Sequence, residues 1–98
     1  MIVAFSISPT SGDADGGVAE AVAAAVRVVR ESGLPNETNA MFTNVEGEWD
    51  EVMDLLKSCV EKVAETAPRV SVVVKLDYRP GHPNAMQHKV EAVEQHLR

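Results

Sequence analysis

The stretch that decides the fold is Val70-Ser71-Val72-Val73-Val74-Lys75-Leu76-Asp77-Tyr78. It is rich in β-branched residues, which is typical of a strand. Successive side chains of a strand point to opposite faces of its sheet. One face therefore carries Val70, Val72, Val74, Leu76 and Tyr78. The other carries Ser71, Val73, Lys75 and Asp77. This pattern predicts a sheet with one face buried under helices and one mixed face.

A second strand is predicted at the start of the chain, over Ile2 to Ser8, with Val3, Phe5 and Ile7 facing the helices. Pro9 and a glycine-rich loop through residue 17 end this strand. We expect Asp13 or Asp15 in that loop to cap the helix that follows, because a carboxylate can accept hydrogen bonds from the first helical N–H groups.

Apolar residues at helical spacing predict three helices. The first runs from Val18 to Val29 and stops at Gly33, where a left-handed residue is favoured. The second precedes Pro68, with Cys59 at the edge of its apolar stripe, which comprises Trp49, Val52, Met53, Leu56, Val60, Val63 and Ala64. In this interpretation Trp49 is a core anchor. The third helix closes the chain: Asn84 and Gln87 resemble a capping box, and its apolar positions are Met86, Val90, Val93 and Leu97.

The segment from Asn36 to Gly47 has no helical period. We expect two short strands, near Glu37–Ala40 and Thr43–Glu46, joined around Met41 and Phe42. One long bent strand is the alternative, because no Gly or Pro marks a turn there.

The resulting order is strand, helix, strand, strand, helix, strand, helix. With right-handed crossovers, this order predicts an α+β fold. It is a ferredoxin-like βαββαβ sandwich with a four-stranded antiparallel sheet, two helices on one face and an extra C-terminal helix. At 98 residues, the chain is expected to form a single domain, 1–98. The uncovered face would carry Ile2, Ala4, Ser6 and Val73 beside Lys75 and Asp77, a mixed surface that favours self-association.

Composition narrows the classes of partner and compartment. The net charge of −6 argues against nucleic acid and anionic membranes, which attract basic proteins. One cysteine excludes an intrachain disulfide. We expect a cytoplasmic protein, since neither a signal peptide nor an apolar run of membrane-spanning length is recognisable.

The other groups of polar residues are better explained by structural roles than by metal binding or catalysis. His88 and His96 share a helix with Glu91 and Glu94, but their spacing is loose for zinc, so we expect a solvated helix and no metal. The Asp13-Ala14-Asp15 stretch lacks the remaining ligands of a calcium loop. We identify no catalytic group and expect no cofactor. Acylphosphatase chemistry would need an arginine in Ser8–Gly17, and RNA recognition would need exposed aromatic residues and a basic surface.

The most unusual segment is residues 37–48, where Asn and Glu occur in what are expected to be strands. In a hairpin, Glu37, Asn39 and either Thr43 or Glu46 can project to one side. A carboxylate beside amide and hydroxyl groups can bind a cationic or amino-substituted heteroaromatic ring. The alternative is an ordinary polar edge strand that resists aggregation. The residue types alone favour neither.

Residues 37–53, with their Val45-Glu46-Gly47-Glu48 step into a helix, resemble the signature of the small YkoF-like thiamine-binding proteins. The opening strand, the Val26–Gly33 helix end and the 70–78 strand extend this resemblance over nearly the whole chain. The resemblance implies a ferredoxin-like fold, and dimers that pair into tetramers. It also implies non-enzymatic, cytosolic binding of thiamine or its hydroxymethylpyrimidine part. A regulatory module that senses another metabolite is the alternative.

The resemblance also implies a site formed by the first strand and the middle strand pair. Carried onto this chain, the ligand-binding residues are Ser6, Ser8, Glu37, Asn39, Met41, Thr43 and Glu46. We expect Glu46 or Glu37 to pair with the aminopyrimidine or the thiazolium charge. Asn39 and Thr43 would supply hydrogen bonds, and Met41 a soft contact to a ring. On this interpretation, Glu46→Gln weakens binding and leaves the oligomer intact.

Overall fold

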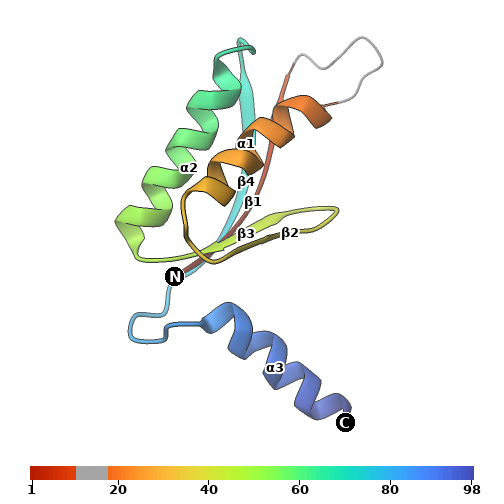
Figure 1. Cartoon of the computed structure of the whole chain (residues 1–98), viewed down its shortest axis with the longest axis vertical. Coiled ribbons are helices and arrows are strands. Elements are labelled where there is room, and N and C mark those ends of the chain that lie inside the picture. The colour runs from red at the N-terminus through yellow and green to blue at the C-terminus, as the bar shows by residue number, and fades with distance from the viewer. Residues whose placement is uncertain (11–17) are drawn as a thin grey trace.

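The computed structural model describes residues 1–10 and 18–98 of the chain. Figure 1 shows a sheet with two helices packed on one face and a third helix standing apart. The elements are β1 (Ile2–Pro9), α1 (Ala19–Glu31), β2 (Asn36–Thr38), β3 (Thr43–Glu46), α2 (Trp49–Ala64), β4 (Val70–Asp77) and α3 (Ala85–Leu97).

The sheet has the strand order β2-β3-β1-β4, and each neighbouring pair is antiparallel. β1 is therefore a central strand: it pairs with β4 along its whole length, from Ile2 opposite Asp77 to Pro9 opposite Val70. Its pairing with β3 is shorter and ends where Phe5 lies opposite Thr43. This topology confirms the ferredoxin-like α+β fold, with α3 as the extra C-terminal helix.

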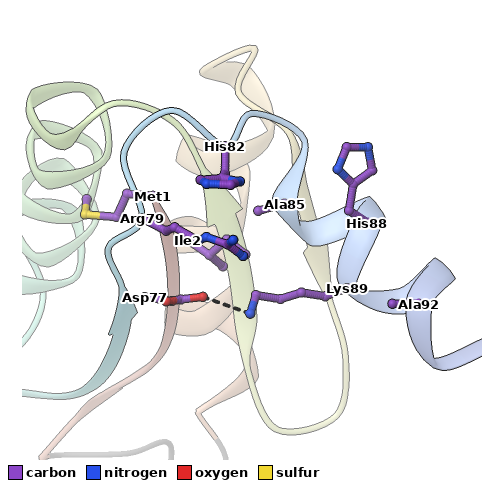
Figure 2. Close-up of a pocket in the computed structure, with 9 residues that line it drawn as sticks. All are labelled: Met1, Ile2, Asp77, Arg79, His82, Ala85, His88, Lys89 and Ala92. Carbon is purple, nitrogen blue, oxygen red and sulfur yellow. Dashed lines mark ion pairs between the residues drawn. The ribbon is translucent and has the colours of Figure 1, made fainter.

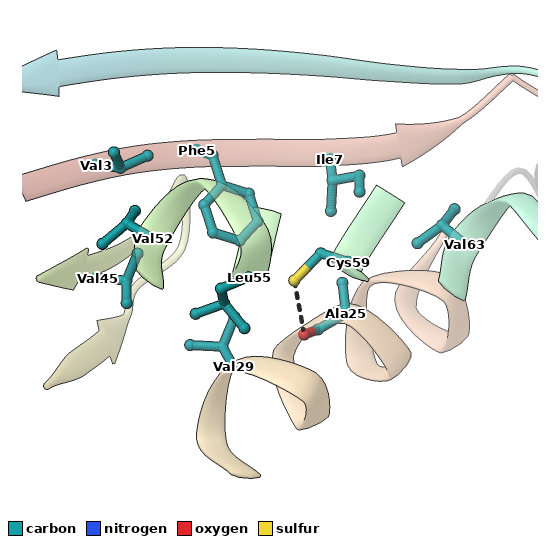
Figure 3. Close-up of a cluster of buried hydrophobic side chains, with 10 residues drawn as sticks. All are labelled: Val3, Phe5, Ile7, Ala25, Val29, Val45, Val52, Leu55, Cys59 and Val63. Atoms are coloured by element: carbon teal, nitrogen blue, oxygen red, sulfur yellow. Dashed lines mark hydrogen bonds between the residues drawn. The ribbon is translucent and has the colours of Figure 1, made fainter. Parts of the chain in front are cut away.

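The core lies between the sheet and the pair α1 and α2 (Figure 3). Val3, Phe5 and Ile7 of β1 are all buried there, as their alternation predicts. The helices contribute Ala25 and Val29 from α1, with Val52, Leu55, Cys59 and Val63 from α2. The buried stripe of α2 is thus rotated from the predicted one, because Leu55 and Cys59 point inward while Leu56 and Val60 are only half-buried. Cys59 is a central core residue and not an edge residue.

Two further core predictions are wrong. Val74 and Leu76 were expected under the helices, yet they are 43% and 37% exposed, because β4 is an edge strand that the helices cover only in part. Trp49 was expected to anchor the core, but it is 49% exposed at the start of α2. Its ring instead meets Tyr78 edge-on, with centroids 6.0 Å apart.

The middle segment forms two strands and not one bent strand. Asn39 explains the turn between them, because its Oδ1 accepts hydrogen bonds from the N–H groups of Met41 and Phe42, each at 2.9 Å. A side-chain turn of this kind needs neither glycine nor proline. It also ends β2 at Thr38, so Ala40 belongs to the turn and not to the strand.

Some of the helix ends have the structure that the local sequence predicts. α1 is followed by Gly33 at φ +80°, the left-handed conformation that the sequence predicts. α2 begins with a hydrogen bond from the Glu48 N–H to the Glu51 carboxylate. The proposed capping of α1 by Asp13 or Asp15, and the Asp13-Ala14-Asp15 loop itself, lie outside the described residues.

Helix α3 projects away from the rest of the chain (Figure 1). All of α3 is described, and it contains no buried residue. Its predicted capping box does not form: Asn84 has the left-handed φ of 59° and makes no side-chain cap, while Gln87 donates to Glu91. None of the helices in the described parts of the chain is long and apolar enough to cross a membrane.

The burial of Cys59 gives a direct test of the helix packing. Its side chain is fully buried, its Sγ lies 3.5 Å from the Ala25 carbonyl oxygen, and burial raises the pKa of the thiol to about 11. Because the thiolate is the reactive form, we expect no modification by a thiol reagent at pH 8 in the native state. Denaturant should expose the thiol and give one equivalent of reaction. Fast native labelling, followed by mass spectrometry, would contradict this packing.

Candidate functional site

A cleft opens where β1 continues past the end of β3. We call it the hairpin cleft, because the turn between β2 and β3 forms one side of it and α1 forms another. Its volume is about 190 Å³. It is lined by Phe5, Ser6, Ile7, Val22, Ala25, Val26, Thr38, Asn39, Ala40, Met41, Phe42 and Thr43.

The lining of the hairpin cleft combines apolar and polar side chains. Val22 and Val26 supply aliphatic surface from α1, and Phe5 and Phe42 supply aromatic surface from the sheet side. At the polar end, the Thr38 and Thr43 hydroxyl oxygens lie 3.1 Å apart in one hydrogen bond. A hydroxyl pair retains further donor and acceptor capacity. A mostly apolar cleft with few polar groups is the usual form of a small-molecule site.

Four of the seven predicted site residues line this cleft: Ser6, Asn39, Met41 and Thr43. Strand alternation directs the Ser6 side chain to the opposite face of the sheet, since its neighbours Phe5 and Ile7 point to the core, so the Ser6 hydroxyl does not face the cleft. Ser8 is not among the lining residues. Glu37 is exposed, and its Oε1 accepts a hydrogen bond from Asn44 Nδ2 at 2.9 Å.

Glu46 lies at the other end of β3, away from the hairpin turn. It is only 7% exposed. Its carboxylate accepts hydrogen bonds from the N–H groups of Ala85, at 2.6 Å, and Met86, at 3.4 Å. Glu46 thus caps α3, a role that the sequence did not indicate. It also borders a groove of about 460 Å³ whose lining includes Trp49, Tyr78 and His82.

The sequence did not single out Thr38, Val22 or Val26 for the cleft. Thr38 lies opposite Thr43 in the strand register, so a correct hairpin alignment identifies it. Val22 and Val26 are one helical turn apart, a spacing that marks a helix face but does not tell a core contact from a cleft wall.

A separate cavity of about 280 Å³ lies between the ends of β1 and β4 and the start of α3 (Figure 2). Lys89 on α3 forms an ion pair with Asp77 on β4, with Nζ and Oδ2 3.0 Å apart. The hydrogen bond from Lys89 and its positive charge lower the pKa of Asp77. At neutral pH, the ion pair therefore stabilises the contact between α3 and β4. This stabilisation is lost as the pH falls through the lowered pKa of Asp77. Arg79 and His82 also line this cavity.

Nothing in the described ranges, 1–10 and 18–98, groups three His, Cys, Asp or Glu side chains in a way that could hold a metal ion. The lining of the hairpin cleft offers hydrogen bonds and apolar contact to a small organic ligand.

Comparison with known proteins agrees with this architecture. The family described as "Thiamine-binding protein" matches residues 3–94. This chain belongs to the thiamine-binding protein family. Among curated relatives, the UPF0045 protein Mb1933 of Mycobacterium bovis is 54% identical over 99 residues, covering 99% of this chain and 94% of the relative. The UPF0045 protein MJ1052 of Methanocaldococcus jannaschii is 31% identical over 93 residues, covering 95% and 91%.

Solved structures share the fold of this chain. The MJ1052 structure superposes with a TM-score of 0.84 at 31% identity, covering 95% of this chain and 94% of that one. TM0486 of Thermotoga maritima, described as a candidate thiamine biosynthesis or salvage protein, superposes with a TM-score of 0.78 over 93% and 96% of the two chains. At 24% identity, the second likeness is one of fold alone.

Proposed function

We propose that this member of the thiamine-binding protein family binds thiamine or its hydroxymethylpyrimidine part in the hairpin cleft, without catalysing a reaction. The observation that supports this most directly is the meeting of Asn39, Met41 and Thr43 around one cleft. These residues come from the segment that resembles thiamine binders in sequence. The family is named for binding and not for a reaction, which also favours a binding role.

The size of the cleft favours a single ring. Pockets that hold whole drug-sized ligands enclose about 300–1,000 Å³. The hairpin cleft, at about 190 Å³, is smaller. We therefore propose that it takes the pyrimidine ring, between the apolar side chains of α1 and those of the hairpin. The thiazolium ring of thiamine would lie outside the cleft, at its mouth.

Calorimetry with thiamine, thiamine phosphates and hydroxymethylpyrimidine tests this proposal. We expect the free pyrimidine to bind, because it contains the whole part that enters the cleft. Thr43→Val keeps the side-chain shape but removes the hydroxyl, so it should weaken binding about fivefold to tenfold. Ser58→Ala is the control, since Ser58 is an exposed residue of α2 whose hydroxyl donates to the Asp54 carbonyl in its own helix.

Two results would contradict the proposal. One is that calorimetry detects no heat of binding for any of the three compounds, while another metabolite raises the melting temperature of the protein. That result would favour the alternative of a regulatory module that senses another metabolite. The other is equal affinity of the Thr43→Val and Ser58→Ala variants, which would move the ligand to another site.

We further propose that copies of the chain associate through α3. Its exposed apolar residues lie on one side of the helix, where Val90 is 58%, Val93 60% and Leu97 74% exposed. An isolated helix with an apolar stripe is poorly stable in water and is usually covered by a partner. A second copy would supply the same stripe by symmetry.

The oligomer is tested by changing the stripe. Val93→Glu places a charge within the proposed contact, so we expect the mass in analytical ultracentrifugation to fall by half or more. Gln95→Glu adds the same charge on the opposite side of α3 and should leave the mass unchanged. A wild-type protein that sediments as a monomer at micromolar concentration would exclude this contact.

A further inference from the structure

The hydrogen bonds of β1 show toward which neighbouring strand the N–H and C=O groups of each of its residues point. Met1 and Gly47 exchange two hydrogen bonds, from the Met1 amino group to the Gly47 oxygen at 3.0 Å and from the Gly47 N–H to the Met1 oxygen at 3.1 Å. In an antiparallel pair, such doubly bonded residues alternate with unbonded ones. Odd-numbered residues of β1 therefore direct their N–H and C=O groups toward β3.

The hydrogen bonds on the β4 side of β1 support the same alternation. The Thr10 N–H donates to the Arg69 oxygen at 3.0 Å, in continuation of the β1–β4 register. Even-numbered residues thus direct their backbone groups toward β4. Both observations assign the N–H and C=O of Ile7 to the side where the hairpin cleft lies.

Ile7 has no backbone partner there in the described residues. Continuing the β1–β3 register would place residue 41 opposite it. However, the Met41 N–H is directed to the Asn39 side chain, which pulls the chain into the turn. Pro9 supports this assignment: it is the next odd residue, and proline is tolerated in a strand only where no ladder N–H is needed.

Ile7 lines the hairpin cleft and is only 7% exposed as a whole residue, and its N–H and C=O have no backbone partner on that side within residues 1–10 and 18–98. Buried backbone groups without a partner are rare and costly, so they favour a ligand that supplies one. A 4-aminopyrimidine carries a ring nitrogen that accepts a hydrogen bond, next to an amino group that donates one. We infer that Ile7 pairs with this edge as a missing β3 residue would, its N–H donating to the ring nitrogen and its C=O accepting from the amino group.

This inference rests on the proposed function and makes it specific for aminopyrimidines. The first experiment is two-dimensional ¹H–¹⁵N NMR with hydroxymethylpyrimidine. We expect the Ile7 amide proton to shift downfield and its exchange with solvent to slow at least tenfold. The Phe5 amide, already paired with β3, serves as the internal control. An Ile7 amide that is equally protected without ligand would overturn the inference.

The second experiment removes only the donor. Semisynthesis can replace the Ile7 N–H with an ester oxygen and retain the side chain. We expect a loss of about tenfold in hydroxymethylpyrimidine affinity, and a smaller loss for the analogue that lacks the 4-amino group. The matched control is an ester at Val74, whose N–H points to the open edge of β4 by the same alternation.

The outcomes separate the two proposals. If the pyrimidine binds to wild type and to the Ile7 ester equally well, the backbone contact is wrong while the proposed function stands. If the pyrimidine does not bind to the wild-type protein, both are wrong. Equal losses in the Ile7 and Val74 esters would show a general effect of esters on the sheet and would also overturn the contact.

Discussion

Phe5→Ala is expected to lower the free energy of unfolding by about 3–5 kcal/mol, the usual cost of emptying a buried aromatic position. Phe5 is 2% exposed and lies in the central strand of the sheet, facing α1 and α2 (Figure 3). Small domains are stable by only about 5–15 kcal/mol, so this single change should remove a large share of the stability. Urea denaturation, followed by circular dichroism, measures the loss.

Two further variants serve as comparisons for Phe5→Ala. Phe5→Leu keeps most of the apolar volume and should cost less than half as much. Ser6→Ala changes the neighbouring position, whose side chain points to the other face, and should alter stability by less than about 0.5 kcal/mol. Similar costs for Phe5→Ala and Ser6→Ala would show that the assigned faces of β1 are wrong.

The inner face of β1 was predictable because a period of two is unambiguous in a short strand. Val3, Phe5 and Ile7 are the apolar residues of one face, and all are buried. Helix α2 was harder, since apolar residues occupy more than one side of it. The sequence favoured Leu56, whereas the docking of α2 on α1 buries Leu55 and Cys59. Such a rotation depends on the neighbouring helix, which the local sequence does not contain.

The same limit applies to β4. Its alternation shows which residues share a face, but not how far the helices reach across the sheet. Val74 and Leu76 remain partly exposed, because β4 is at the sheet edge. Helix α3 likewise contains no buried residue, which is why we propose that other copies of the chain cover it.

The candidate site was predictable where side-chain chemistry marked it. Asn39 and Thr43 are unusual residues for strands, and both line the hairpin cleft. Asn39 also forms the turn, and this role is visible only once its two backbone partners are known. The proposed contact at Ile7 is made by backbone atoms, so no residue type in the sequence could indicate it.

Glu46 makes an interaction that the sequence did not indicate. A carboxylate in a strand suggests a ligand, and the sequence alone cannot pair it with a helix that begins 39 residues later. In the structure, this carboxylate supplies the cap that Asn84 does not provide. A negative group at the start of a helix is favoured by the helix dipole, in addition to its hydrogen bonds.

Glu46→Ala should therefore release α3. It removes the acceptor for the Ala85 and Met86 N–H groups, and a charge-assisted hydrogen bond contributes about 1.5–3 kcal/mol. We expect hydrogen exchange across residues 85–97 to accelerate about tenfold to a hundredfold, while exchange in β1 changes little. Glu46→Gln keeps a neutral acceptor and should give an intermediate acceleration.

Glu37→Ala is the matched control, because it removes the same charge from the neighbouring strand, where Glu37 is exposed and accepts a hydrogen bond from Asn44. If α3 holds copies of the chain together, Glu46→Ala should also weaken self-association, whereas Glu37→Ala should not. Pyrimidine binding in the hairpin cleft should survive Glu46→Ala, since Glu46 is not among its lining residues. Loss of pyrimidine binding with α3 exchange unchanged would instead assign Glu46 to the ligand and not to the helix.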